Sequence, residues 1–188
     1  MTRTELLKML DYLDNKDVWC FDVNMFNLFF PDENKQVRNV SLKRHTKSGI
    51  IINVCRGFYA NPRARSKPNF ALPKLAHILR AREVFYLSYE AALSDYGIIS
   101  QMPNRLTFAT TGRSGEYDTP YGILEFTHSS RNPATFLENC IYDEDYGLYY
   151  ANPRKAVRDA LRANRNIGLI DFDELEETEK EMKNELAS

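Results

Sequence analysis

Apolar residues recur at helical spacing from the start of the chain. Over residues 3–14 the leucines fall on one stripe at about 100° per residue, which predicts an amphipathic helix. Asp22 is suited to cap a second helix, because its carboxylate can accept hydrogen bonds from free N–H groups at a helix start. That second helix carries spaced apolar residues over 23–30, and Pro31 ends it. The two expected helices indicate a small packed domain at the N-terminus.

Residues 33–47 predict a third helix, and its polar side is the more informative one. Glu33 and Asn34 suit a helix start, and Gly49 suits a helix end. Amide groups beside lysines match base edges and phosphates of nucleic acid, although a solvated, lysine-rich face is a common alternative. One stripe of this helix carries Gln36, Asn39, Lys43 and Lys47, and the opposite side carries Val37, Ser41, Leu42 and His45.

Two short apolar runs follow the third helix. Ile50–Ile52 and Phe58–Tyr59 predict two strands, and Arg56-Gly57 predicts a turn between them with a cation at its tip. A basic hairpin tip next to a basic helix is suited to lie on phosphates. We therefore predict a winged helix-turn-helix over residues 1–68. The polar, proline-containing stretch 61–69 marks its boundary.

Residues 69–188 alternate helical and β-rich runs, which predicts a mixed α/β second domain and an α+β chain overall. Leu106–Thr111 and Ile123–Thr127 are expected to form a hairpin with GRSGEYDTPYG as its long polar tip. From about residue 173 Glu and Lys dominate, which predicts a polar helical tail. Further short helices are predicted near 72–79, 89–96, 133–139 and 155–162, and further strands near 84–87 and 148–151.

The charge of the chain is divided unevenly. Its 188 residues carry a formal net charge of −1, which alone indicates no partner. Residues 1–68 hold 12 Lys/Arg and 7 Asp/Glu, a balance of +5, whereas residues 69–188 hold 13 and 19, a balance of −6. A basic front and an acidic back indicate a polyanionic partner for one and a protein partner for the other.

The sequence favours a reduced, cytoplasmic, non-enzymatic protein. Three scattered cysteines form no CxxC pair, and no apolar run is long enough to span a membrane. Gly112–Gly115 lacks the spacing and lysine of a phosphate-binding loop, so a turn is the better interpretation. Asp143–Asp145 could hold a metal ion, but adjacent carboxylates do not readily converge, so a solvated turn is favoured. We predict no catalytic residue, cofactor or metal.

Short motifs follow one another in a fixed order along the chain. In the second domain they are Tyr86–Leu93, Tyr96–Ile99, Gln101–Arg105, Thr110–Ser114, Tyr121-Gly122, Glu125–His128 and Ala151–Pro153 with Lys155-Ala156 and Asp159, preceded by Lys47–Ile51 and Arg56–Ala60. This series resembles the AbiEi family of antitoxins: each motif is weakly specific alone, but their order and spacing fit along most of residues 1–175. Within the third helix the chain departs from the family at His45, where an apolar residue is usual.

The resemblance implies the antitoxin of a type IV toxin–antitoxin system linked to abortive phage infection. Such a protein represses its own operon by binding inverted-repeat promoter DNA, as a possible homodimer, and counteracts a nucleotidyltransferase-like toxin through its C-terminal domain. We expect Gln36, Asn39, Lys43 and Lys47 to face the major groove and Arg38, Arg44 and Arg56 to hold phosphates. The candidate partner-binding residues are Arg105, Arg113, Ser114, Lys155 and Asp159.

Two other functions fit the same sequence. The chain could be a stand-alone winged-helix regulator without a toxin, which an absent neighbouring nucleotidyltransferase gene would favour. It could also be a protein-interaction module whose N-terminal domain does not bind DNA. Absent or salt-insensitive DNA binding would favour this second alternative.

Overall fold

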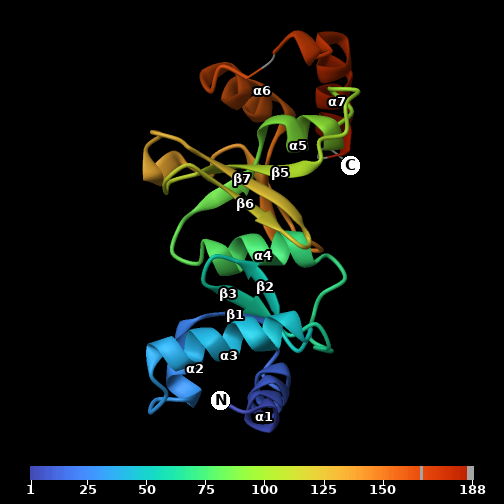
Figure 1. The fold of residues 1–188 in the computed structure, drawn as a ribbon. Coiled ribbons are helices and arrows are strands. Elements are labelled where there is room, and N and C mark those ends of the chain that lie inside the picture. The colour runs from blue at the N-terminus through green and yellow to red at the C-terminus, as the bar shows by residue number, and fades with distance from the viewer. Residues whose placement is uncertain (166, 186–188) are drawn as a thin grey trace. The chain divides into compact units, whose positions relative to one another are not determined.

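The computed structural model describes residues 1–165 and 167–185 of the chain. It divides into two compact units, Met1–Ala71 and Leu72–Ser188. The sequence placed this boundary after residue 68, in the connector, whereas the structural boundary falls at the start of the next helix. The predicted tail reaches residues 186–188, which lie outside the described residues. Both units mix helices and strands, as an α+β chain does (Figure 1).

The first unit packs three helices against a small sheet. Thr2 and Glu5 form a capping box at the start of α1, and the core holds the buried apolar side of that helix. Phe26 lies in this core with its ring 5.5 Å from Phe21 and 5.4 Å from Tyr59. The elements are α1 (Arg3–Asp14), β1 (Cys20–Asp22), α2 (Asn24–Phe29), α3 (Lys35–Lys47), β2 (Ile52–Cys55) and β3 (Phe58–Ala60).

Strand β3 is the centre of an antiparallel sheet with the order β1-β3-β2. The predicted pair of strands after the third helix is therefore present, although β2 begins only at Ile52. Ile50 and Ile51 are buried in the core instead. Asp14, at the end of α1, accepts hydrogen bonds from the backbone N–H groups of Arg65 and Ser66 at 3.0 and 2.9 Å. The connector is thereby fixed to the first unit.

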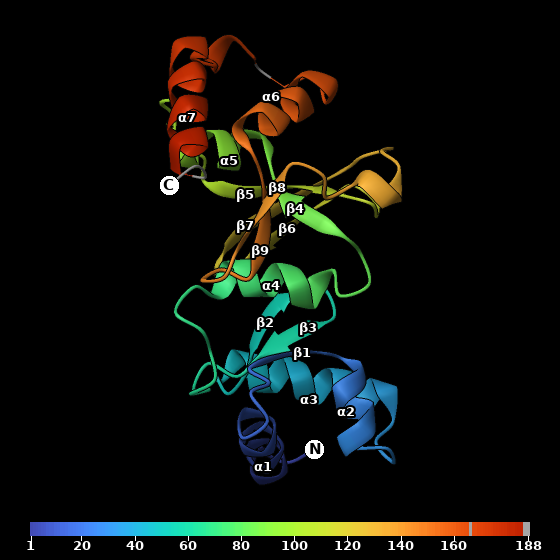
Figure 2. The same ribbon diagram turned by 180° about the vertical axis from the view of Figure 1, so that it is seen from behind.

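The second unit is a six-stranded mixed sheet with the order β6-β7-β5-β4-β9-β8. Helix α4 covers one face, and α5, α6 and α7 lie on the other (Figures 1 and 2). Buried rings of Phe85, Phe108 and Phe126 pack within 4.9–5.5 Å of one another. The helices of this unit are α4 (Ala71–Leu79), α5 (Tyr89–Asp95), η1 (Pro133–Thr135), α6 (Pro153–Arg162), η2 (Ile167–Leu169) and α7 (Phe172–Glu185).

The prediction that Leu106–Thr111 and Ile123–Thr127 form a hairpin in the second domain is wrong. Its two runs form β5 and β7, which pair in parallel, with Leu106 opposite Leu124. The segment expected to be a loop contains β6, which pairs antiparallel with β7 through a tight turn at Gly122 (φ +126°). The connector between β5 and β7 is long enough to form a strand of its own, β6. Because β6 runs antiparallel to β7, the chain turns back once more, and β7 runs parallel to β5. The strands are β4 (Phe85–Leu87), β5 (Arg105–Thr110), β6 (Gly115–Thr119), β7 (Gly122–His128), β8 (Cys140–Asp143) and β9 (Leu148–Ala151).

Two further observations concern membranes and metals. In the described part of the chain no helix has the length and apolar character to cross a membrane. Asp143 accepts a hydrogen bond from the backbone N–H of Tyr146 at 2.9 Å, as in a solvated turn. Within residues 1–165 and 167–185, no three His, Cys, Asp or Glu side chains are grouped to hold a metal ion.

Candidate nucleic-acid interface

Helix α3 presents the predicted polar stripe to solvent. Asn34 caps the helix by accepting the backbone N–H of Gln36 at 2.8 Å, which fixes where the helix begins. Lys43 and Lys47 have no ion-pair partner among the described residues. The exposed residues of the stripe are Gln36, Asn39, Lys43 and Lys47. The stripe therefore combines amide donors and acceptors with uncompensated positive charge.

The buried side of α3 differs from the prediction in two positions. Arg38 is only 8% exposed, so the expectation that it holds a phosphate is wrong. Val37 was expected inside and is exposed. The reason is the phase of the helix, because the positions that face the core are 38, 41, 42 and 45, which include only one large apolar residue, Leu42. Most of the buried side chains of α3 are therefore polar or charged.

Polar contacts on the α3 side of the first unit involve the chain start. Arg44 Nη2 donates to the carbonyl oxygen of Met1 at 3.2 Å, and His45 Nε2 lies 3.5 Å from the same oxygen. The amino group of Met1 pairs with Glu33. Arg44 is exposed nevertheless, so its guanidinium can still approach a phosphate. The N-terminus thus supports the helix at both ends.

The turn between β2 and β3 carries a further exposed cation of the candidate interface, after Lys43, Arg44 and Lys47. Arg56 is exposed at this turn, and Gly57 follows with φ +85°, a conformation that favours glycine. Asn53 Nδ2 donates to the carbonyl oxygens of Cys55 and Phe58 at 3.2 and 3.4 Å, which braces the turn from inside. Arg56 therefore stands on a defined turn without an ion-pair partner in the described chain.

In the second unit, Lys155 and Asp159 lie inside rather than on a contact surface. They are 1% and 4% exposed, so the expectation that they contact a partner is wrong. Tyr86 Oη and Ser88 Oγ donate to Asp159 at 2.9 and 2.8 Å, and Arg131 pairs with its other oxygen. The two residues thereby connect α6 to the sheet.

The ammonium group of Lys155 is held by the backbone. Its Nζ donates to the carbonyl oxygens of Phe136 and Glu138 at 2.7 and 2.6 Å, and it lies 4.4 Å from the centre of the Tyr86 ring. Burial lowers the pKa of Lys155 and raises the pKa of Tyr86. These groups form an internal network in which the ammonium group and the carboxylate each have hydrogen-bond partners.

Of the other candidate partner-binding residues, Arg105 is already engaged. Its Nη1 donates to Glu116 and Glu125 at 2.7 and 3.1 Å. Arg113 and Ser114 are exposed and line a shallow hollow of about 400 Å³. Ser114 Oγ accepts the backbone N–H of His128 at 2.8 Å, which leaves Arg113 as the available cation of this loop.

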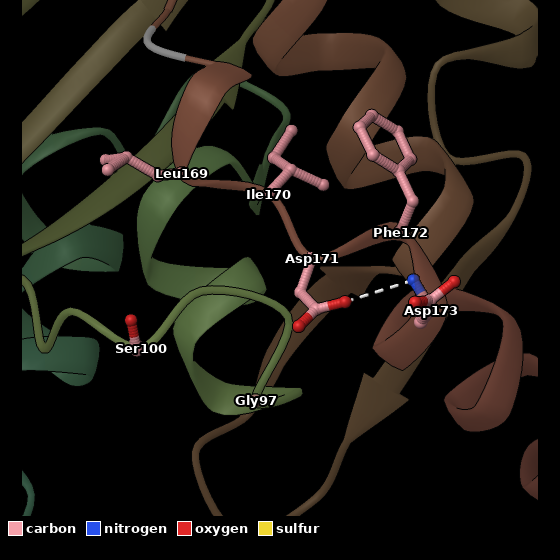
Figure 3. A pocket seen from close by; sticks show the side chains of 7 residues that line it. All are labelled: Gly97, Ser100, Leu169, Ile170, Asp171, Phe172 and Asp173. Atoms are coloured by element: carbon pink, nitrogen blue, oxygen red, sulfur yellow. Dashed lines mark hydrogen bonds between the residues drawn. The ribbon is translucent and has the colours of Figure 1, made fainter.

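A larger hollow of about 510 Å³ lies where the segment after α5 meets the start of α7 (Figure 3). Asp171 accepts the backbone N–H groups of Asp173 and Glu174 at 3.0 and 3.1 Å, so its carboxylate caps α7. This capping explains the acidic lining without a ligand. The lining residues are Gly97, Ser100, Leu169, Ile170, Asp171, Phe172 and Asp173.

A third hollow contains cations that the sequence analysis missed, and we call it the arginine hollow. Its volume is about 210 Å³, and Arg131, Arg158 and Arg162 line it beside Lys155. Arg158 and Arg162 are one helical turn apart on α6, a spacing visible in the sequence. Arg131 comes from a distant segment, so only the fold brings it to them. The remaining lining residues are Asn132, Thr135, Glu138 and Asn139.

Comparisons with known proteins show the fold and no more. No protein-family model and no curated protein sequence matches the chain. Among solved structures, the chain is similar to the Rv2827c protein from Mycobacterium tuberculosis, with a TM-score of 0.57 over 95% of this chain and 72% of that one. The two sequences are 11% identical, so the similarity concerns the fold alone.

Proposed function

We propose that the first unit is a winged helix-turn-helix that binds double-stranded DNA through α3 and the β2–β3 turn. The observation that carries this proposal is the exposed, uncompensated set of Lys43, Lys47 and Arg56 beside Gln36 and Asn39. Lysine and arginine neutralise phosphates, and amide side chains pair with base edges in the major groove. Arg44 is retained as a phosphate contact.

On this proposal the protein is an autorepressor of its operon. Two chains would place their α3 helices in successive major grooves of an inverted repeat, about 34–36 Å apart. The order of the AbiEi-like motifs supports a second role, in which the second unit counteracts a nucleotidyltransferase-like toxin encoded next to it. The exposed Arg113 is the partner-binding candidate that its surroundings leave available.

A mobility shift tests the DNA proposal. Purified full-length protein is titrated onto the DNA upstream of its gene and onto scrambled DNA at two salt concentrations. We expect specific binding that salt weakens, and each of Lys43→Ala and Arg56→Ala to reduce the log–log salt slope by about 0.9 for every chain in the complex. Lys16→Ala removes an exposed cation that lies on neither α3 nor the turn, and it serves as the control. Unchanged binding by both interface variants would contradict the assignment.

Co-expression separates the antitoxin role from DNA binding. The full chain carrying Lys43→Ala and Arg56→Ala is expressed with the adjacent toxin from an unrelated promoter, so that repression cannot affect the result. We expect cell growth to be restored as well as by the natural chain. If neither chain restores growth although both accumulate, the second unit does not act as an antitoxin.

One observation favours the alternative of a protein-binding first unit. Val40 is 68% exposed and Val37 is 54% exposed, both on the outer side of α3. Exposed apolar side chains can contact either a protein or the methyl groups of thymine. A pull-down with α3 variants would support this alternative if Val40→Ser abolished a protein contact while DNA binding remained absent throughout.

A further inference from the structure

Two arginines of the arginine hollow have no ion-pair partner among the described residues, as is also true of Arg82 and Arg113 elsewhere in this unit. Residues 69–188 contain 19 Asp/Glu and 13 Lys/Arg, so arginines there have carboxylates in excess. Arg80, Arg105, Arg154 and Arg165 each pair with a glutamate. In residues 1–165 and 167–185, Arg158 and Arg162 have no such partner.

The positions of these two arginines bring their like charges close together. They are four residues apart on one helix, where like charges repel each other. Both are exposed and line the same hollow as Arg131. Glu138 also lines it without forming an ion pair in the described structure. The hollow therefore presents two guanidinium groups, those of Arg158 and Arg162, that pair with no carboxylate in the described structure.

The floor of the arginine hollow is fixed. Arg131 is held by Asp159, which Tyr86 and Ser88 hold in turn. Lys155 binds the backbone of the neighbouring wall through Phe136 and Glu138. The fixed floor loses little further order when an anion binds, whereas the exposed rim arginines become ordered only on binding, at a cost in side-chain entropy.

A smaller hollow adjoins the arginine hollow and shares Arg131 and Arg162 with it. Its volume is about 150 Å³, and its wall includes Ser129 and Tyr89. Tyr89 has φ +56°, a left-handed conformation that is unfavourable for an aromatic residue. Such backbone strain persists where the surrounding structure imposes it, and it is commoner at functional sites.

We propose that the arginine hollow binds a diphosphate group, either as free pyrophosphate or as part of a nucleotide. The planar guanidinium group forms paired hydrogen bonds to two oxygens of a phosphate group. This geometry favours a phosphate group over a simple monovalent anion as the ligand. The volume of about 210 Å³ equals that of about seven water molecules, which accommodates such a group. This site lies in the second unit, and its binding does not depend on DNA binding by the first.

Titration calorimetry of the full chain with sodium pyrophosphate tests the proposal, at constant ionic strength. We expect saturable binding that Arg158→Ala with Arg162→Ala weakens by about tenfold or more. Arg158→Lys with Arg162→Lys keeps the charge but not the planar fork, and we expect it to recover part of the affinity. Circular dichroism verifies that each variant keeps the fold.

The control removes equal charge elsewhere in the same unit. Arg82 and Lys180 are exposed and do not line the hollow. The double variant Arg82→Ala with Lys180→Ala should bind pyrophosphate as the natural chain does. An equal loss in this control would mean general electrostatic attraction and would overturn the proposal, as would the absence of saturable binding.

Two further ligands identify the source of the phosphate. If uridine or adenosine triphosphate binds more tightly than pyrophosphate, and the arginine variant loses both, the ligand is a nucleotide that extends into the smaller hollow. Equal affinity with the same loss supports recognition of the diphosphate alone. A polyglutamate peptide that binds as well as pyrophosphate would show an acidic-protein site and would overturn the phosphate assignment.

Discussion

Helices α3 and α6 both carry cations to the surface, but they differ in what holds them from inside. Under α6, Lys155 and Asp159 are buried with their hydrogen bonds made. Under α3, the Nε of buried Arg38 has no hydrogen-bond partner in the described structure, and His45 has only a long contact of 3.5 Å. The polar groups beneath α6 therefore fix that helix in place, whereas those beneath α3 contribute much less.

The largest effect should follow from opening the network beneath α6. Asp159→Asn leaves Arg131 without its anionic partner and places an amide against Tyr86 and Ser88. Breaking one side of a buried charged pair costs about 3–5 kcal/mol. We expect the second unit to unfold at a markedly lower urea concentration, measured by far-ultraviolet circular dichroism.

Fluorescence of the single tryptophan, Trp19, reports the first unit separately, because it is buried there. Its transition should not move in Asp159→Asn. Asp118→Asn, an exposed carboxylate on β6, is the matched control and should change neither transition. If Asp159→Asn proves as stable as this control, the network beneath α6 does not hold the helix.

Acid should weaken the second unit through a second carboxylate. Burial alone raises the pKa of Glu125, but hydrogen bonds and charges from Arg165 and Arg105 outweigh it, so the pKa lies below its ordinary value of 4.5. The ion pairs therefore stabilise the fold fully above about pH 4.5, and this contribution is lost as pH falls through the lower folded-state pKa.

The variant Glu125→Gln tests this pH dependence. It should be less stable than the natural chain near neutral pH, and the difference should shrink below about pH 4.5. Urea unfolding at several pH values measures the difference. A difference that stays constant with pH would mean that Glu125 acts through packing and not through its charge.

On α3, a smaller effect should appear in DNA recognition. Val40 lies on the outer side of the helix, one turn from Gln36 and one turn from Lys43. If one of its two methyl groups packs on a thymine methyl group, Val40→Ala should weaken promoter binding by about fourfold for each chain, as expected for about 0.8 kcal/mol per buried CH₂-sized group.

A promoter made with deoxyuridine in place of thymidine lacks those methyl groups. It should weaken binding by the natural chain but have no further effect on Val40→Ala, as measured by mobility shift. If the two losses add, Val40 does not read the methyl group. Specific binding in every case would still support the DNA-binding proposal.

The smallest effect should come from Arg38→Met. A buried arginine with an unpartnered Nε gains little from its charge, and apolar replacements of buried ionic groups are often neutral or stabilising. We expect the Trp19 transition to change by less than about 1 kcal/mol and the salt dependence of DNA binding to stay the same. A large loss of stability would show that α3 is fixed as firmly as α6.

Local patterns predicted much of the molecule, including α1, α3, α6 and the strand pair after α3. Periodicity placed Lys43 and Lys47 outside correctly, since each position on a helix has a fixed direction. It failed at Arg38, because the sequence rule assigns charged residues to the surface while the packing of the unit decides which side faces inward. At position 38 the residue type favoured the surface, whereas the phase of the helix placed the side chain inside.

Longer-range relations were not predictable from these patterns. The sequence could not show that β5 and β7 pair in parallel, because pairing direction depends on how the chain between them folds. In the same way Arg131 reaches Arg158 and Arg162 only through the fold. The sequence motifs likewise did not indicate that Lys155 and Asp159 are buried.

The exposure of the outer side of α3 to solvent has a consequence for the evolution of the chain. The residues there make few contacts that stabilise the unit, so substitutions at these exposed positions should cost little folding free energy. Descendants of this chain can therefore change that surface one position at a time and keep a folded protein at each step. Helix α6 lacks this freedom on its inner side, where any change must preserve a complete set of hydrogen bonds.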